Sequence, residues 1–522
     1  MADQHQHRQP HPSSDSRVQS AVLSTAQVPR LQAKLGRLMP YSIPLFRRIQ
    51  HHATHPVPDT ASIFVAVATD SADHDTPQQD DVAIDQWLQD SDSSTTTRMG
   101  NSTGQSRLRR RTDTDTDTDS RHRPWIAAHI DLAHYGSTQV WVFASWECPP
   151  PSLSTSTTSP LSSSSSSNAL ATTPDHERER NTQSQRETAD RIVEDDNEGS
   201  DDDDPRHGAL MIALYRYIYH DLVPRMSTEP GEDWLELKRT GKSLTIPYSR
   251  NKILFGTINT KLLRWVPGQA RTRIDAGYLK YIFAIDPDLE DSDHHGKDSS
   301  REDERNGAPV DDSSNSSNSS DKYRALPPGY TFGPMQSAHL QAVLDRSVVP
   351  RTLATLQQFP SLGVFPLPQW EDNQNKEHDA TAATAAATEG PELEPNPKLE
   401  PKSGDQMRGS GTGKPVAWGF LGTDASLSGL HTEPEHRGKG LAGCVGRELL
   451  RRSAWRGGVE GHVDVDPDPR SIFNWGHADV SIQNKASRRV MEKLGGVARW
   501  KVAWVEVDLA VALDVLLSVR SG

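Results

Sequence analysis

Long low-complexity stretches break this 522-residue chain into short patterned segments. Ser, Thr, Asp, Pro and Gly dominate these stretches, which lie at about 66–120, 149–207, 287–321, 371–413 and 457–471. Such stretches bury too little apolar surface to offset the entropy lost on ordering, so we expect them to be disordered. Since only 34% of all residues are apolar, about half of the chain is expected to be globular. No patterned segment is large enough to close a core alone, which indicates insertions into one fold.

The patterned segments contain both helical and strand periodicity. Residues 28–52 place leucines at helical spacing before a proline break, and residues 209–224 predict an amphipathic helix. Residues 125–147 predict two strands around a Tyr-Gly-Ser turn. Residues 338–367 predict two short helices and a strand. Helices and strands are therefore mixed along the chain.

The most regular segment, residues 415–509, predicts the order β-β-α-β-α-β. Two strands lead through a glycine-rich corner into a first helix. A third strand precedes a second helix, for which Asn484 suits the N-cap and Gly495 the C′ position. A fourth strand closes the segment. This order predicts an α/β fold with a mixed sheet flanked by helices.

The corner between the second strand and the first helix has the residue types of an anion site. It reads RGKGLA over residues 437–442. The first amides of a helix are unpaired and together carry about half a positive charge. Glycines let the backbone approach a ligand, and charge-assisted bonds from Arg437 and Lys439 contribute about 1.5–3 kcal/mol each. The corner suits a diphosphate, although a solvated turn has the same composition.

Two motifs resemble the GNAT superfamily of acyl-CoA-dependent N-acyltransferases. HTEPEHRGKGLAG (431–443) resembles the R/Q-x-x-G-x-G/A signature of that superfamily. Further along, SIQNKASRRVMEKLGG is similar to its N-x-x-S helix through Asn484 and Ser487. A looser similarity of LMPYSIPLFRRIQ and TQVWVFASWE to glycine N-acyltransferase-like proteins implies a tandem arrangement. The resemblance implies a GNAT-type fold and N-acyl transfer from acetyl-CoA or another acyl-CoA.

With this resemblance, the chain divides into four parts. We expect a disordered tail over 1–27 and an N-terminal GNAT-like or acceptor-side region over 28–370, interrupted by the first three low-complexity stretches. A disordered linker over 371–413 then leads to an acyl-CoA-binding GNAT domain over 414–509.

The resemblance also implies how the cofactor binds. Pantetheine is expected between the strands LSGLHT and HADVSI, which splay apart beyond a bulge. Backbone groups of the first strand would pair with pantetheine and polarise the thioester carbonyl, and the helix N-terminus would hold the diphosphate. The implied cofactor-binding residues are Leu430, His431, Thr432, Arg437, Gly438, Lys439, Gly440, Leu441, Ala442, Asn484 and Ser487.

The sequence departs from the family pattern where proton transfer is expected. Many members carry a general-acid Tyr where this chain has Met491, and a basic carboxylate where it has Ser428 and Gly429. A free amine is mostly protonated near neutral pH, so a base or a water chain is still needed.

Asp479 is the nearest ionisable substitute, with His477 or Ser428 behind it. A solvated carboxylate at a strand end is the alternative interpretation of Asp479. The candidate catalytic residues are therefore Asp479 and Asn484.

Two functions remain open: an N-acyltransferase that acts on a small-molecule or amino-acid amine, and a GNAT-fold scaffold that keeps a CoA site. The H-x-E in HTEPEH lacks the P-C-x-x-C partner of zinc deaminases, and the chain has only Cys148 and Cys444, so we expect no metal. No apolar run approaches the ~18 residues of a membrane span. We expect a cytoplasmic protein without a membrane or nucleic-acid partner.

Overall fold

The structure is a computed structural model. It describes residues 17–55, 58, 60–69, 78–89, 123–133, 137–149, 204–241, 247–285, 326–347, 349–367, 413–455 and 475–521. The stretches 287–321 and 457–471 lie outside the described residues, as do most of the other three stretches expected to be disordered.

The N-terminal half, residues 17–285, contains strands β1 to β6. Its strands are β1 (Arg17–Val22), β2 (Ser62–Thr69), β3 (Trp125–Ile130), β4 (Val140–Ala144), β5 (Lys252–Asn259) and β6 (Arg271–Ala284). Its helices are α1 (Val28–Gly36), α2 (Ile43–Thr54), α3 (Gln78–Gln89), η2 (Ser145–Glu147), α5 (Pro205–Tyr217), the π-helix η3 (Ile218–Leu222), η4 (Val223–Arg225), α6 (Glu232–Arg239), α7 (Thr260–Leu263) and η5 (Gly268–Ala270).

The C-terminal half, residues 326–521, contains strands β7 to β12. Its strands are β7 (Tyr330–Gly333), β8 (Ser361–Pro366), β9 (Ala417–Leu421), β10 (Leu427–Thr432), β11 (Trp475–Ser481) and β12 (Val497–Asp508). Its helices are α8 (Ser337–Arg346), α9 (Leu353–Gln357), η9 (Pro434–His436), α11 (Leu441–Trp455), α13 (Lys485–Lys493) and α14 (Leu509–Ser521).

The strands form two sheets that meet at one point. The larger sheet has the order β1-β2-β3-β4-β5-β12-β6-β11, and the smaller has the order β10-β9-β8-β7. Neighbours in both sheets are antiparallel except β4 and β5, which are parallel. An isolated parallel bridge between Ser426 and His477 joins the start of β10 to β11. The expected mixed sheet flanked by helices is confirmed.

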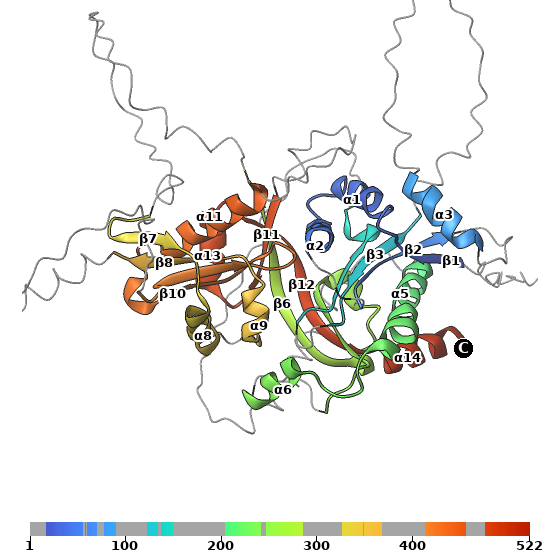
Figure 1. Ribbon diagram of the computed structural model, residues 1–522. Coiled ribbons are helices and arrows are strands. Elements are labelled where there is room, and N and C mark those ends of the chain that lie inside the picture. The colour runs from blue at the N-terminus through green and yellow to red at the C-terminus, as the bar shows by residue number, and fades with distance from the viewer. Residues whose placement is uncertain are drawn as a thin grey trace, which may run out of the picture.

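Two long strands exchange places between the halves. β12, from the C-terminal end of the chain, lies between β5 and β6. β6, from the N-terminal half, lies between β12 and β11. Figure 1 shows both as long curved strands that run between the two groups of elements. Each half therefore supplies a strand that completes the sheet of the other half.

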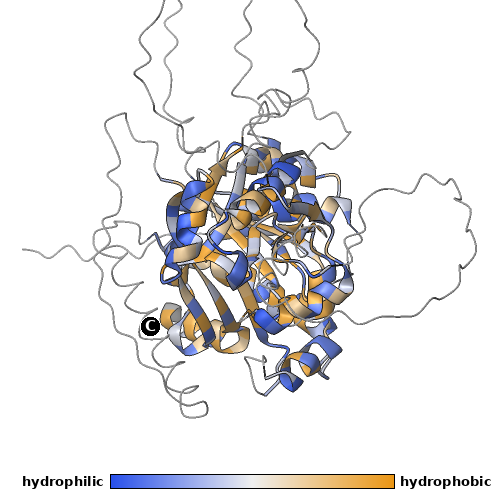
Figure 2. Ribbon diagram, turned by 90° about the vertical axis from the view of Figure 1, so that its left-hand side faces the viewer, coloured by the Kyte–Doolittle hydropathy of each residue, from blue (hydrophilic) through white to orange (hydrophobic). Residues whose placement is uncertain are grey.

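Helices cover both faces of each half. In the N-terminal half, α1, α2 and α3 pack on one face through a core that includes Leu31, Phe46 and Ile84, and α5 and α14 pack on the other. In the C-terminal half, α11 and α13 cover one face, while α8 and α9 cover the face that carries Trp418 and Phe420 (Figure 1). Figure 2 shows hydrophobic residues concentrated along the strands and the inner sides of the helices.

Most elements expected from periodicity are confirmed. The helices in 28–52, the strands in 125–147, the elements in 338–367 and the order of elements in 415–509 all form as predicted. The expected boundaries of the tail and the domains agree less well with the structure. The expected tail over 1–27 is wrong from residue 17 onward, because β1 pairs with β2 along its whole length.

The expected domain start at 414 also divides a continuous sheet. β8, which precedes the expected linker, pairs with β9, which follows it. The last helix, α14, lies beyond the expected end at 509 and packs in the same core as α5. The C-terminal GNAT-like unit thus begins before β7, and residues 368–412 connect two of its own strands.

Candidate cofactor site and reaction centre

The corner predicted at 437–442 lies between β10 and the N-terminus of α11. Gly438 and Gly440 have φ values of +77° and +81°, in the left-handed region that favours glycine. A Cβ added at Gly438 would meet no atom within 4 Å, so this part of the corner is open. Leu441, only 1% exposed, anchors the first turn of α11 in the core. The two glycines therefore shape the corner and leave its backbone bare.

Backbone amides without acceptors line this corner. Among the described residues, the N–H groups from Gly438 to Gly443 have no hydrogen-bond acceptor. Cys444 is the first residue of the helix whose N–H donates, to the carbonyl of Gly440 at 3.1 Å. A row of free amides at a helix N-terminus suits an anion that offers several oxygens.

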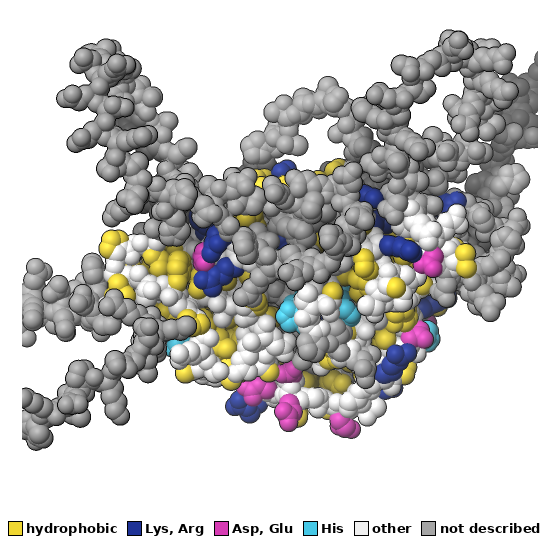
Figure 3. All heavy atoms as spheres, turned by 45° about the horizontal axis from the view of Figure 1, so that its top comes forward, with side chains coloured by type: hydrophobic (Ala, Val, Ile, Leu, Met, Phe, Trp, Pro, Cys, Tyr) yellow, Lys and Arg dark blue, Asp and Glu magenta, His cyan; other side chains and the backbone are white. Residues whose placement is uncertain are grey.

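Two exposed cations flank the amides. Arg437 Nε donates to the carbonyl of Thr432 at 3.1 Å, and Lys439 Nζ donates to Tyr330 Oη at 2.8 Å. Tyr330 Oη is in turn 2.9 Å from His436 Nδ1. Within the described part of the chain, neither cation forms an ion pair with a carboxylate. Figure 3 shows Lys and Arg side chains spread over this face, with one group of them on its left, over the C-terminal half. The positive charge at the corner is therefore not neutralised by these residues.

The strand before the corner is bulged. The pairing of β10 with β9 shifts between Ser428 and His431, which leaves Gly429 and Leu430 without partners on β9. Gly429 has a φ of +61°, and a Cβ there would lie 3.1 Å from the ring of Phe420. Beyond the bridge from Ser426 to His477, β10 and β11 belong to different sheets. The two strands diverge there, as expected for the pantetheine position.

The residues implied for pantetheine lie on this bulged strand. Leu430 packs its side chain on the α11 side, beside Gly419 and Gly446. His431 stacks on Trp418 with ring centroids 4.4 Å apart, and burial lowers the pKa of His431. Thr432 pairs with Ala417, so the strand is regular again before the corner.

Asp479 lies in a buried ion pair. Its carboxylate is 2.7 Å from Lys280 Nζ, and the two side chains are 6% and 0% exposed. Thr257 Oγ1 donates to the same carboxylate at 3.1 Å. The alternative interpretation, a solvated carboxylate at a strand end, is therefore wrong, because β6 places Lys280 directly across from Asp479. Both hydrogen bonds, from Thr257 Oγ1 and from the ammonium, end on Oδ2, whereas Oδ1 accepts no hydrogen bond among the described residues.

His477 and Ser428 differ in whether their polar atoms already have hydrogen-bond partners. His477 is fully buried, its Nε2 lies 2.8 Å from the carbonyl of Asp424, and its Nδ1 lies 3.4 Å from Lys280 Nζ. Burial lowers the pKa of His477. Ser428 Oγ, in contrast, is buried and has no hydrogen-bond partner among the described residues. Ser428 Oγ is thus one of several polar atoms near the bulge, with Thr432 Oγ1 and Asp479 Oδ1, that accept or donate no hydrogen bond among the described residues.

The second motif forms a capped helix. Asn484 Oδ1 accepts from the N–H of Ser487 at 3.0 Å at the start of α13. Leu494 is the C-cap and Gly495 follows with a φ of +84°, so both expected caps are confirmed. Met491, in place of the family Tyr, is 3% exposed in the core. Asn484 is therefore a helix cap in this structure, and its catalytic role remains a prediction.

The described residues of the N-terminal half do not form a matching cofactor site. Its helix α5 lies between β4 and β5 in the chain, as α11 lies between β10 and β11, but Asp204 caps the N-terminus of α5 by accepting from the N–H of Arg206 at 2.9 Å. Pro205 has no N–H, so the first turn offers fewer free donors. Between β4 and β5, Gln139 Oε1 accepts from the N–H of Leu254 at 3.0 Å. Unlike β10 and β11, which diverge, β4 and β5 are therefore joined by hydrogen bonds.

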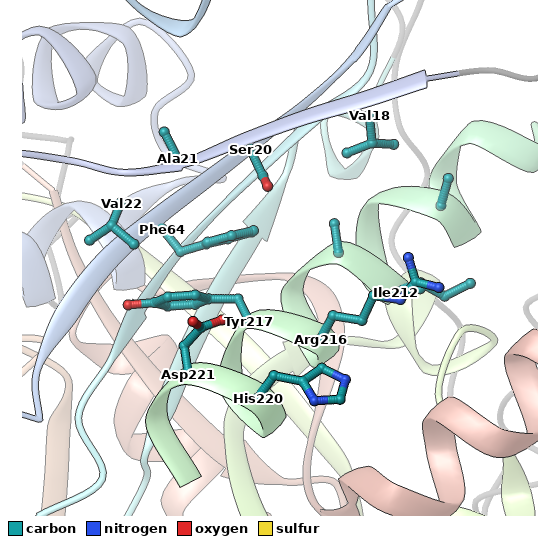
Figure 4. Close-up of a pocket in the computed structure, with 12 residues that line it drawn as sticks. Val18, Ser20, Ala21, Val22, Phe64, Ile212, Arg216, Tyr217, His220 and Asp221 are labelled. Carbon is teal, nitrogen blue, oxygen red and sulfur yellow. The ribbon is translucent and has the colours of Figure 1, made fainter. Parts of the chain in front are cut away.

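A groove of about 480 Å³ lies in the N-terminal half, between β1 and α5 (Figure 4). Tyr217, Asp221 and Arg216 line one side, and the ring of Tyr217 stacks on Phe64. None of the residues implied for cofactor binding or catalysis lies in this groove. Among the described residues, no group of three or more His, Cys, Asp or Glu is arranged for a metal, and no helix is long and apolar enough to cross a membrane.

Solved structures show similarity at low identity. A Drosophila protein is 10% identical over 94% of this chain and 98% of its own, with a TM-score of 0.39. A tandem GNAT protein from the clavulanic acid biosynthesis pathway is 10% identical over 94% and 99%, with a TM-score of 0.31. A putative GNAT acetyltransferase from Novosphingobium aromaticivorans is 14% identical over 49% and 73%, with a TM-score of 0.24. These scores are too low to support a detailed comparison.

No curated protein matches the chain. A family model does: it is described as the acyl-CoA N-acyltransferase verG N-terminal domain, and it matches residues 10–281, just over half of the chain. This match lies in the half opposite to the one that carries the two motifs. The chain therefore belongs to this family of acyl-CoA N-acyltransferases, within the GNAT superfamily that its C-terminal motifs resemble.

Proposed function

We propose that the protein transfers an acyl group, most simply acetyl, from acyl-CoA to an amine by direct attack. The observation that carries this proposal is the row of free amides from Gly438 to Gly443, flanked by Arg437 and Lys439. This row lies at the end of a bulged strand that diverges from its neighbour. Free amides bind the diphosphate of CoA, and the divergence leaves room for pantetheine.

The described residues suggest how the reaction centre works. The backbone at Gly429 and Leu430, unpaired with β9, is available to the thioester carbonyl. The amine nitrogen attacks the carbonyl carbon, the carbon–sulfur bond breaks, and CoA leaves as its thiolate. Ser428 Oγ orients the amine or the water that accepts its proton. Asp479 and Asn484 then act by positioning β11 and α13.

Gly440→Asp tests this proposal. The substitution places a carboxylate among the amides and a side chain at a φ of +81°, so CoA binding measured by calorimetry is expected to be lost. Gly241→Asp is the matched control, since Gly241 also has a positive φ, of +69°, and open space around it, but ends α6. Release of free thiol with a panel of amines and acetyl-CoA measures turnover. Unchanged CoA affinity in Gly440→Asp would remove the corner from the site.

A scaffold that binds CoA without turnover is the second candidate. The ion pair that occupies Asp479 and the buried Met491 favour it, because neither residue offers a free acid or base. Binding of CoA by the wild-type protein with no thiol release from any amine would select this function. Neither described cysteine, Cys148 or Cys444, forms a disulfide, which supports a reducing compartment such as the cytoplasm.

A further inference from the structure

The loop between α8 and α9 places Arg351 beside the bulge of β10. Its Nη1 lies 3.7 Å from the position that a Cβ would take on Gly429. The ring of Phe420, on the face covered by α8 and α9, lies near the same position. Arg351 therefore approaches the bulge from the face opposite to α11, whose N-terminus forms the proposed diphosphate site (Figure 1).

The guanidinium of Arg351 has no acceptor. Within the described residues it forms neither a hydrogen bond nor an ion pair, and it lies 5.4 Å from the centre of the Phe359 ring. Burial lowers the pKa of Arg351. A guanidinium carries five N–H donors. Arg351 is only partly buried, so these donors remain available to an anion beside the bulge.

The carboxylate of Asp424 does not bind this guanidinium. Asp424 attracts Arg351 electrostatically but forms no ion pair with it. Asp424 Oδ1 already accepts from the N–H and the hydroxyl of Ser426, at 3.1 and 2.6 Å. His477 and Lys280 also lie close enough to lower the pKa of Asp424. Arg351 thus remains available to a second anion that enters beside the bulge.

We propose that Arg351 binds a carboxylate of the substrate, most directly the α-carboxylate of an amino-acid acceptor. A guanidinium can hold a carboxylate through two parallel hydrogen bonds, which fixes both position and orientation. An α-amino group is one carbon away from that carboxylate, so it would face Gly429 and Ser428. This inference rests on the proposed acyl transfer and narrows its acceptor to amines that carry an acidic group.

Amino acids and their carboxamides, offered with acetyl-CoA, test the inference in the full-length protein. The wild type is expected to prefer the carboxylates by at least about tenfold in kcat/KM, the lower end of a charge-assisted interaction. Arg351→Gln is expected to remove this preference through KM and to leave the Kd for CoA unchanged. Arg351→Lys should keep part of the preference. Arg239→Gln is the control, because Arg239 is an exposed residue of α6.

Succinyl-CoA carries a carboxylate on its acyl group, so it distinguishes recognition of the acyl donor from recognition of the acceptor. If Arg351→Gln impairs transfer from succinyl-CoA but not the use of amino acids, Arg351 recognises the acyl group instead of the acceptor. Equal use of carboxylates and carboxamides by wild type, with neither donor affected by Arg351→Gln, overturns the inference. A wild-type protein that does not bind CoA would instead overturn the proposed function.

If no amine releases thiol, amino acids are titrated calorimetrically onto the CoA-saturated protein. Binding that Arg351→Gln abolishes supports the carboxylate site, and the absence of such binding overturns it.

Discussion

Replacing Lys280 should lower the free energy of unfolding more than replacing any exposed lysine or arginine. Lys280 is fully buried, and its ammonium lies 2.7 Å from Asp479 and 2.6 Å from Thr257 Oγ1. Lys280→Met keeps the volume of the side chain but leaves the carboxylate of Asp479 buried without its counter-ion. Breaking a buried pair in this way costs about 3–5 kcal/mol in the free energy of unfolding. The double variant Lys280→Met/Asp479→Leu should recover most of this loss, because no charge is left unpaired.

Urea unfolding followed by tryptophan fluorescence measures these differences in the free energy of unfolding. For each variant, the slope of this free energy against urea concentration is compared first, and the free energies are compared second. Arg239→Met is the control, because the pair of Arg239 with Glu236 is exposed and should contribute less than about 1 kcal/mol. Two results would refute the reasoning. One is a loss below about 1 kcal/mol for Lys280→Met; the other is a double variant no more stable than the single variant.

Three further predictions concern the cofactor and pH. Arg437→Ala and Lys439→Ala should each raise the Kd for CoA about tenfold to a hundredfold, since each removes one charge-assisted contact; unchanged calorimetric titrations would contradict this. Calorimetry should give one CoA per chain, because Pro205 and Asp204 close the equivalent end of α5; a second equivalent would show that the N-terminal half also binds. Burial raises the pKa of Glu147 to about 8, so the folded state retains a proton that the unfolded state releases. The free energy of unfolding should therefore fall as the pH rises from about 5 to about 8. Urea titrations at several pH values measure it, and Glu147→Gln should make it less dependent on pH over this range.

Local chemistry explains which parts of the site could be predicted from the sequence. The corner at 437–442 depends on glycines with positive φ and on the first turn of one helix, and both are written in consecutive residues. The caps of α13 at Asn484 and Gly495 are local in the same sense. These features were predicted because no distant residue is needed to form them.

Features that join distant residues could not be predicted in this way. Asp479 was predicted as a candidate catalytic residue, with a solvated strand-end carboxylate as the alternative, but its partner Lys280 lies 199 positions earlier in the chain. Arg351 lies in a short loop with no motif of its own, and only the packing of α8 and α9 brings it to Gly429. The strand β1, RVQSAV, is too short and polar to stand out from the tail that precedes it.

The exchange of β6 and β12 has a consequence for how the molecule is made. During synthesis, β5 and β6 leave the ribosome long before β12, the strand that separates them, exists. Until the last part of the chain emerges, their facing edges are unpaired and open to association with other nascent chains. A stop codon ahead of residue 497 would remove that strand and so leave the N-terminal half incomplete, although it deletes none of that half's own residues.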